Sequence, residues 1–413
     1  MCTALKINLE KTNPKRMNQI WNTSDQSLHP KILSFTAQED AKLDAEIFLP
    51  YDIDASIAHA KMLNKMQLLS SEELTQAIET LSELKKNHAN HGVKIPEGME
   101  DGHTYLEALL TEKHGDLGKK IHTARSRNDQ ALTMIRLYMK DQSAQITKAI
   151  DSLIQTWSSW IKKHEALPMP GYTHMQKAMP TTLGMWQGAY LEALQDLKNY
   201  LQATSQILDQ SPLGSAAGFG VPMELDRELT AKEMGFSKVQ TNPIYCQLSR
   251  GPFEAMISFA CMQIMSLISR WANDVLLFTT SEYDFFELPK EFCTSSSIMP
   301  QKKNYDALEM LRGSLALSQG HFNTIQNLHQ SLHTGYHRDL QLLKAPLVAS
   351  FQITQDALEV TDLLAENLLA KEAELNAAMT DELFATHKVY ELVKQGLTFR
   401  EAYAQVKAET NTL

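Results

Sequence analysis

A long stretch without glycine, and without proline until Pro168, most constrains what this chain can fold into. It runs from Lys119 to Met169. Apolar side chains recur in it mostly at steps of three and four residues: Leu132, Ile135, Met139, Ile146, Ile150, Leu153, Trp157 and Ile161. This spacing aligns them on one face of an α-helix. The stretch therefore predicts a single very long helix.

Four later segments repeat this apolar pattern, and they run from Thr182 to Gln210, Pro252 to about Tyr283, Asp306 to about Leu332, and Ala345 to about Asn376. Helices of such length are typical of bundles, in which apolar stripes need partner helices. We therefore expect a homo-oligomer. The most apolar stretch, Ala255 to Leu277, contains Gln263, Arg270 and Asp274, so it is too polar for an easy membrane span. It predicts a helix buried nearly all round.

The expected fold class is all-α, a long central helical bundle flanked by two smaller helical domains. The predicted domains are an N-terminal helical domain at 1–124, the central bundle and oligomer core at 125–374, and short C-terminal helices at 375–413. Ser70 or Ser71 is predicted to cap a helix in the first domain. Residues 1–16 are polar and without periodicity, and we put forward the hypothesis that translation begins at Met17.

Composition narrows the function. The formal charge of -10 leaves no basic surplus to displace counterions from a polyanion, which argues against nonspecific nucleic-acid binding. No segment resembles a signal peptide. The four cysteines lack paired or metal-ligand spacing, so they indicate reduced thiols in a cytoplasmic protein: Cys2, Cys246, Cys261 and Cys293. We expect no metal and no organic cofactor.

The loop Ser295–Asn304, Ser-Ser-Ser-Ile-Met-Pro-Gln-Lys-Lys-Asn, with Glu309 after it, carries the strongest chemical signal. A mobile polar loop of this kind can present an activated serine and a cation to an anionic substrate. Taken alone, the loop is better explained as a solvated serine-rich loop with surface lysines, and the other segments below change that balance.

Four other segments add functional groups. Arg125, Arg127 and Asn128 fall at the start of the first long helix, where free N–H groups and the helix dipole favour anions. An ordinary capped helix start is the alternative.

His174 lies in a loop bounded by proline and glycine and is suited to proton transfer, although such a histidine is more often structural. The glycine-rich run 212–220 lacks the ending of a phosphate loop, so a nucleotide site is disfavoured. Residues 336–344 supply phenol, amide and ammonium groups.

Together these segments resemble the argininosuccinate lyase family of the aspartase/fumarase superfamily over almost the full length of the chain. The loop 296–304 is similar to the loop that defines the superfamily. The motifs at 126–130, 171–174 and 336–341 are similar to those particular to the argininosuccinate branch, and further matches lie at 51–56, 100–103 and 399–402. The resemblance implies a helical homotetramer whose active sites each gather residues from three subunits.

The resemblance implies β-elimination of argininosuccinate to arginine and fumarate, a step of arginine biosynthesis. It makes Ser296 the base, Lys302 the cation beside the developing charge, and His174 with Glu309 the pair that protonates the leaving nitrogen or orients the site. Arg127 and Asn128 would bind the succinate carboxylates, and Ser126 and Asn304 would also contact the substrate. The arginine side would be bound by Ser56, Tyr336 and Gln341. Thr173, Arg227 and Lys344 are weaker assignments.

The chain also departs from the family pattern. Ser295 and Tyr305 stand where the loop usually has glycine and proline, and Ala124 replaces a glycine. Leu342 and Leu343 replace an acidic pair, which puts the partner of Lys344 in doubt. The usual Gly-Gly-Arg-Phe element is missing after Trp21, and the C-terminal extension is short. Two alternatives stay open. The first is another lyase of the superfamily, with adenylosuccinate, fumarate or aspartate as its substrate, and the second is a catalytically silent structural homologue.

Overall fold

The computed structural model describes residues 29–96 and 99–410. The hypotheses about residues 1–16, Met17, Cys2 and the element missing after Trp21 lie outside the described residues. The chain packs into two compact units, the first from residues up to Lys140 with Leu208–Pro252 and Leu328–Ala345, the second from Asp141–Ile207, Phe253–Asn327 and Pro346 onward. Each unit is described by itself, and the division into three domains stays a prediction.

The first unit is a cluster of short helices. They are α1 (Pro30–Leu43), the π-helical turn η1 (Asp44–Phe48), α2 (Leu49–Lys65), α3 (Ser71–His91), α4 (Gly102–His114), α5 (Asp116–Lys120), α8 (Arg227–Glu233), α9 (Pro243–Leu248) and the 3₁₀ segment η3 (Arg338–Leu343). The two-residue strands β3 (Gln210–Ser211) and β4 (Lys238–Val239) pair in parallel. A core of leucines and isoleucines from α2, α3 and α4 holds the cluster together, including Ile53, Leu63, Leu81 and Leu106. Ser70 caps α3 in a reciprocal capping box with Glu73, as predicted.

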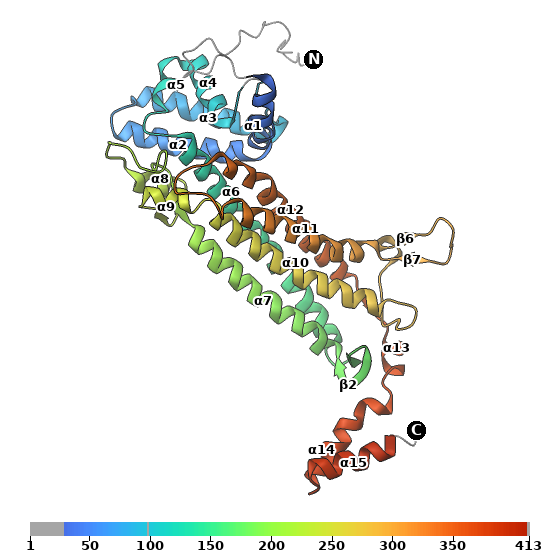
Figure 1. The fold of residues 1–413 in the computed structure, drawn as a ribbon. Helices are drawn as coiled ribbons and strands as arrows, with labels where there is room; N and C mark the ends of the chain where they lie inside the picture. Colours follow the sequence, from blue (N-terminus) through green and yellow to red (C-terminus); the bar gives the residue numbers. More distant parts are fainter. Residues whose placement is uncertain (1–28, 97–98, 411–413) are drawn as a thin grey trace. The chain divides into compact units, whose positions relative to one another are not determined.

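The second unit contains the long helices, which Figure 1 shows running alongside one another. They are α6 (Arg127–His164), which begins in the first unit, α7 (Leu183–Leu208), α10 (Pro252–Phe278), α11 (Asp306–Leu328) and α12 (Lys344–Glu366). The all-α expectation is confirmed: the strands of the described chain form only two-stranded pairs. The fifth helix ends at Glu366 rather than near Asn376, because the strand β8 (Leu369–Ala370) pairs with β5 (Phe286–Glu287).

Helix α10 lies at the centre of this bundle. Trp271 donates from its indole nitrogen to Gln187 of α7 at 3.0 Å and packs 6.1 Å from Trp157 of α6. Phe259 packs 5.4 Å from Phe322 of α11, and Ser258 bonds Ser350 of α12 at 2.9 Å. Four helices therefore cover α10, as its apolar composition predicts. By length and composition the helical stretch Pro243–Phe278 is apolar enough to cross a membrane, but 67% of its most apolar window is buried inside the protein.

Smaller elements complete the second unit. The hairpin of β1 (Pro168–Thr173) and β2 (Gln176–Thr182) joins α6 to α7, and β6 (Thr294–Ser295) pairs with β7 (Lys303–Asn304) just before α11. A 3₁₀ turn, η2 (Lys290–Phe292), precedes β6. The last elements of the described chain are α13 (Glu372–Ala377), the 3₁₀ turn η4 (Asp381–Phe384), α14 (Ala385–Lys394) and α15 (Phe399–Thr410), and Gly396 separates the last two helices.

Candidate functional site

The serine loop of the second unit is held by its own backbone. The Ser296 Oγ accepts hydrogen bonds from the N–H groups of Ile298 at 3.3 Å and Met299 at 3.1 Å. Two backbone donors aimed at one hydroxyl oxygen stabilise negative charge on that oxygen. Ser295 belongs to β6 and is not among the described residues with positive φ, so its side chain introduces no backbone strain where the family has glycine. The Ser296 oxygen is thus preorganised to carry charge.

Lys302 and Asn304 stand on the other side of the same hairpin. Lys302 is exposed, while its neighbour Lys303 is engaged by Glu287 at 2.6 Å. Asn304 is half-buried in β7, and its amide nitrogen lies 3.5 Å from Thr294 Oγ1. Glu309 is exposed on the first turn of α11. The hairpin therefore brings Ser296, Lys302 and Asn304 onto one loop, as their sequence positions predicted.

His174 occupies the tip of the β1–β2 hairpin. His174 and Met175 have φ values of 53° and 61° and form its two-residue turn. A turn with two left-handed residues matches the twist of the flanking strands. Thr173 and His174 are both exposed, so the imidazole projects outward. Glu309, its predicted partner, is likewise exposed in this single chain.

The start of α6 is organised by Asp129. The Asp129 Oδ1 accepts from the Ser126 N–H at 2.9 Å, and its Oδ2 accepts from the N–H groups of Gly214 and Ala216 at 3.0 and 2.9 Å. Burial raises the pKa of this carboxyl above its ordinary range, and the three N–H donors oppose that shift. The glycine-rich segment thus approaches a carboxylate of the protein itself, which explains its small residues.

Arg127 is held by acidic partners in the first unit. Its Nη1 lies 2.7 Å from Glu100, its Nε 3.3 Å from Asp101, and its Nη2 donates to Thr104 at 2.9 Å. Asn128 is half-buried beside it. A carboxylate ligand reaching Arg127 would therefore share this guanidinium with Glu100 and Asp101.

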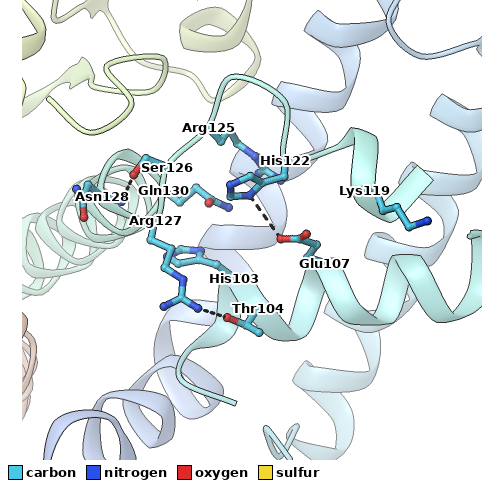
Figure 2. A pocket seen from close by; sticks show the side chains of 10 residues that line it. All are labelled: His103, Thr104, Glu107, Lys119, His122, Arg125, Ser126, Arg127, Asn128 and Gln130. Atoms are coloured by element: carbon cyan, nitrogen blue, oxygen red, sulfur yellow. Dashed lines mark hydrogen bonds and ion pairs between the residues drawn. The ribbon is translucent and has the colours of Figure 1, made fainter. Parts of the chain in front are cut away.

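A cavity of about 660 Å³ opens beside this helix start (Figure 2). Figure 2 shows His122 facing Glu107 across it, at 3.5 Å, while Arg127 turns toward Thr104. Burial lowers the pKa of His122 and raises that of Glu107. The walls carry more donors than acceptors and are formed by His103, Thr104, Glu107, Lys119, His122, Arg125, Ser126, Arg127, Asn128 and Gln130. Such a lining suits anionic groups.

A second cavity, about 130 Å³, is lined by two of the predicted arginine-side residues, Tyr336 and Gln341, together with Lys344, Arg127 and Asn128. Lys344 is buried in its wall, with its Nζ 2.6 Å from Asp44 and 2.9 Å from Asp40. These two aspartates from the α1–η1 region supply the partner of Lys344 that the Leu342–Leu343 replacement had put in doubt. Gln341 donates to the Thr36 carbonyl at 2.7 Å.

Two predicted substrate contacts are engaged within the fold of the single chain. Ser56 is buried, with 1% of its surface exposed, and accepts from Arg125 Nη1 at 2.9 Å. Arg227 donates to the carbonyls of Leu213 at 2.7 Å and Gln240 at 2.9 Å. Their roles toward substrate stay predictions.

The sequence reading missed Asp40, Asp44 and Arg250, which line the second cavity. Only the acidic spacing in α1 and the Arg-Gly pair at 250–251 hint at them. Within residues 29–96 and 99–410, no cluster of three or more His, Cys, Asp or Glu side chains has metal-binding geometry.

The sequence of this chain is similar to those of known lyases. A family model described as lyase matches residues 22–320. The argininosuccinate lyase of Thermotoga neapolitana is 43% identical over 376 residues, covering 91% of this chain and 94% of that protein. The argininosuccinate lyase of Sorangium cellulosum is 39% identical, with 93% and 89% covered.

Solved structures agree on the fold. An EDDS lyase in complex with formate superimposes with a TM-score of 0.79 at 25% identity, covering 94% of this chain and 76% of that one. The class II fumarase of Schistosoma mansoni gives a TM-score of 0.76 at 16% identity, with 89% and 88% covered.

Proposed function

Because this chain belongs to the argininosuccinate lyase family, we propose that it cleaves argininosuccinate to arginine and fumarate by β-elimination. It is a carbon–nitrogen lyase with the fumarase-type fold. The observation that carries the proposed chemistry is the pair of backbone N–H groups aimed at Ser296 Oγ.

The elimination removes a proton from the carbon next to a succinate carboxylate and then breaks the C–N bond to the guanidino nitrogen. It needs a base for that proton, a cation for the charge that develops on the carboxylate, and an acid for the leaving nitrogen. A serine hydroxyl is a poor base unless its alkoxide is stabilised. The N–H groups of Ile298 and Met299 support Ser296 in this role, because they donate to the oxygen that would become charged.

The other groups follow from their positions. Lys302, exposed on the same loop, stabilises the aci-carboxylate, and Asn304 contacts the substrate. Ser126, Arg127 and Asn128 bind the succinate carboxylates at the start of α6, while Ser56, Tyr336 and Gln341 contact the arginine half. His174, at its hairpin tip, works with Glu309 on the leaving nitrogen. Thr173, Arg227 and Lys344 complete the proposed set.

The assembly is a homotetramer whose active sites are shared between subunits. Two features support this proposal. His174 and Glu309 are both exposed in the single chain, which suits residues that meet partners from other subunits. On α11, Met310 and Leu317 leave 69% and 59% of their surfaces exposed, an apolar stripe suited to helix packing. The cytoplasm is the proposed location, consistent with the free thiols of Cys246, Cys261 and Cys293.

Fumarate release tests the activity. Purified protein is mixed with argininosuccinate, and fumarate is followed by ultraviolet absorbance, with adenylosuccinate, aspartate and malate in parallel. Rapid release from argininosuccinate alone is expected. A folded oligomer that is silent on argininosuccinate but active on another of these substrates would refute the proposal.

Ser296→Ala tests the base. The variant should lose elimination, while its helical content by circular dichroism and its oligomeric state by size-exclusion chromatography stay those of the parent. Near-native turnover would remove Ser296 from the base role. Ser297→Ala, one position along the same loop, is the matched control and should keep most of the activity.

A further inference from the structure

Arg250 is a buried arginine that the proposed chemistry does not use. It lies between α9 and α10 with 3% of its surface exposed. Its Nη2 donates to the Leu340 carbonyl at a long 3.4 Å, and its guanidinium carbon stands 5.1 Å from the centre of the Tyr336 ring. Gly251 follows at a φ of 102°, where an added Cβ would come within 2.5 Å of His329. This tight turn fixes where Arg250 can point.

The guanidinium lacks the partners that a buried charge requires. Its Nε and Nη1 have no hydrogen-bond partner among the described residues. It also forms no ion pair within that part of the chain, since the buried cation nearby, Lys344, takes both Asp40 and Asp44. Arginine cannot shed its proton to relieve the cost. A buried charge without a partner costs several kcal/mol, so Arg250 calls for an anion supplied from outside.

The cavity that Arg250 lines is built for a group carrying both charges. Its lining carries cations and carboxylates together: Arg127, Arg250, Arg338 and Lys344 with Asp40, Asp44, Glu100 and Asp101. Tyr336 and Gln341, proposed contacts of the arginine half, form part of the same wall. A volume of about 130 Å³ suits the end of an amino acid rather than a whole substrate. An α-amino acid presents a carboxylate and an ammonium on one carbon, which matches this arrangement.

We propose that Arg250 recognises the α-carboxylate on the arginine half of the substrate, and so determines specificity for an amino acid over the corresponding amine. The inference rests on the proposed function. The planar guanidinium offers paired N–H donors that fit a carboxylate, and the Tyr336 ring stacked against it holds its plane.

The test compares arginine with agmatine, which is arginine without its α-carboxylate. Each is measured by calorimetry on the oligomer and as an inhibitor of argininosuccinate cleavage. Because a charge-assisted hydrogen bond is lost with the carboxylate, the parent protein should bind arginine at least about tenfold more tightly than agmatine. In Arg250→Met this preference should fall below about twofold, through weaker arginine binding with agmatine affinity unchanged. A purely structural loss would weaken both ligands alike.

Two further variants keep the outcome interpretable. Arg250→Lys retains the charge but not the planar fork, and should give an intermediate preference. Arg338→Met removes the same charge from the exposed edge of the cavity, where Arg338 is 51% exposed, and should keep the parent's preference. If Arg250→Met does not fold, the parent and the lysine variant decide. A parent that prefers arginine by less than about twofold, or a folded Arg250→Met that keeps the full preference, overturns the inference.

Fumarate release on the same preparations separates the two proposals. Release from argininosuccinate with an unchanged arginine-to-agmatine ratio in Arg250→Met would refute only the role of Arg250. No release by any preparation, despite arginine binding, would refute the proposed function instead.

Discussion

The buried cluster of Lys344, Asp44 and Asp40 allows its contribution to stability to be calculated from geometry. Lys344 and Asp44 expose 2% and 1% of their side chains, and the ammonium lies 2.6 and 2.9 Å from the two carboxylates. Lys344→Met deletes the ammonium that pairs with both acids of this cluster. Removing one partner of a buried ion pair costs about 3–5 kcal/mol, so we expect a loss of that size in the free energy of unfolding at pH 7.

Asp44→Asn should cost somewhat less, because an asparagine oxygen can still accept from the Gly102 N–H, which Asp44 Oδ2 holds at 3.0 Å. The double variant Lys344→Met/Asp44→Asn should be less destabilised than the sum of the singles, by about 1–3 kcal/mol, since each charge is harmful mainly when the other is missing. Lys42→Met is the matched control, because its 70%-exposed side chain lies 4.0 Å from Glu46 and should change stability by less than about 0.5 kcal/mol.

Urea unfolding followed by circular dichroism, at one fixed protein concentration, measures these differences. Lowering the pH from 7 to 5 should reduce the penalty of Lys344→Met, because burial raises the pKa of Asp40 and protonation of that carboxyl removes one uncompensated charge. Strict additivity of the two single variants, or a loss below about 1 kcal/mol in Lys344→Met, would show that the cluster is not a coupled buried network.

Two further changes test the backbone and the pH response. Ala124 has a φ of 61°, a left-handed conformation that costs a residue with a Cβ about 1–2 kcal/mol, so Ala124→Gly should raise stability by about 1 kcal/mol net of the glycine's larger unfolded entropy. A lower melting temperature in that variant would contradict this. Burial holds the pKa of His59 well below 6.5. Protons therefore bind the unfolded state preferentially, and stability is lost as pH falls below about 6.5, at up to about 1.4 kcal/mol per pH unit. His59→Gln, whose amide nitrogen can replace the His59 Nε2 that lies 2.9 Å from the Thr123 carbonyl, should flatten that slope, and an unchanged slope would exclude His59 as its source.

The long helices were predictable because each carries a local signal. An apolar residue every three or four positions can be read without knowing what packs against it, so the starts of α7, α10 and α11 were found within a residue. The end of α12 was not, because the strand that follows Glu366 exists through pairing with Phe286 and Glu287, far away in the sequence. The segment at His174 was expected as a loop. The hairpin that surrounds it was not predicted, because it depends on pairing between β1 and β2 and not on a repeat of apolar residues.

The candidate site divides in the same way. Ser296, Lys302 and Asn304 share one loop, so their proximity follows from chain connectivity. The aspartates that hold Lys344 lie about 300 positions earlier in the chain, and no periodic pattern connects them to it. Arg250 is similar, since its burial and unmet donors become visible only when the segments 247–252 and 336–344 are seen together. Long-range electrostatic pairing is therefore the part that the sequence alone could not supply.

The four-sided covering of α10 has a consequence for where this protein can move. A helix enclosed by α6, α7, α11 and α12 can release its backbone amides to solvent only when the surrounding helices separate, so its amide hydrogens should exchange at the rate of global unfolding. The hairpin tip at His174 and the loop at Ser296 are exposed and lie outside that enclosure, so their amides can exchange through local opening. The proposed reacting groups therefore lie on segments whose amides exchange fast, attached to a helical bundle whose central helix exchanges slowly. These segments can adjust around a substrate while the helices that carry them stay in place.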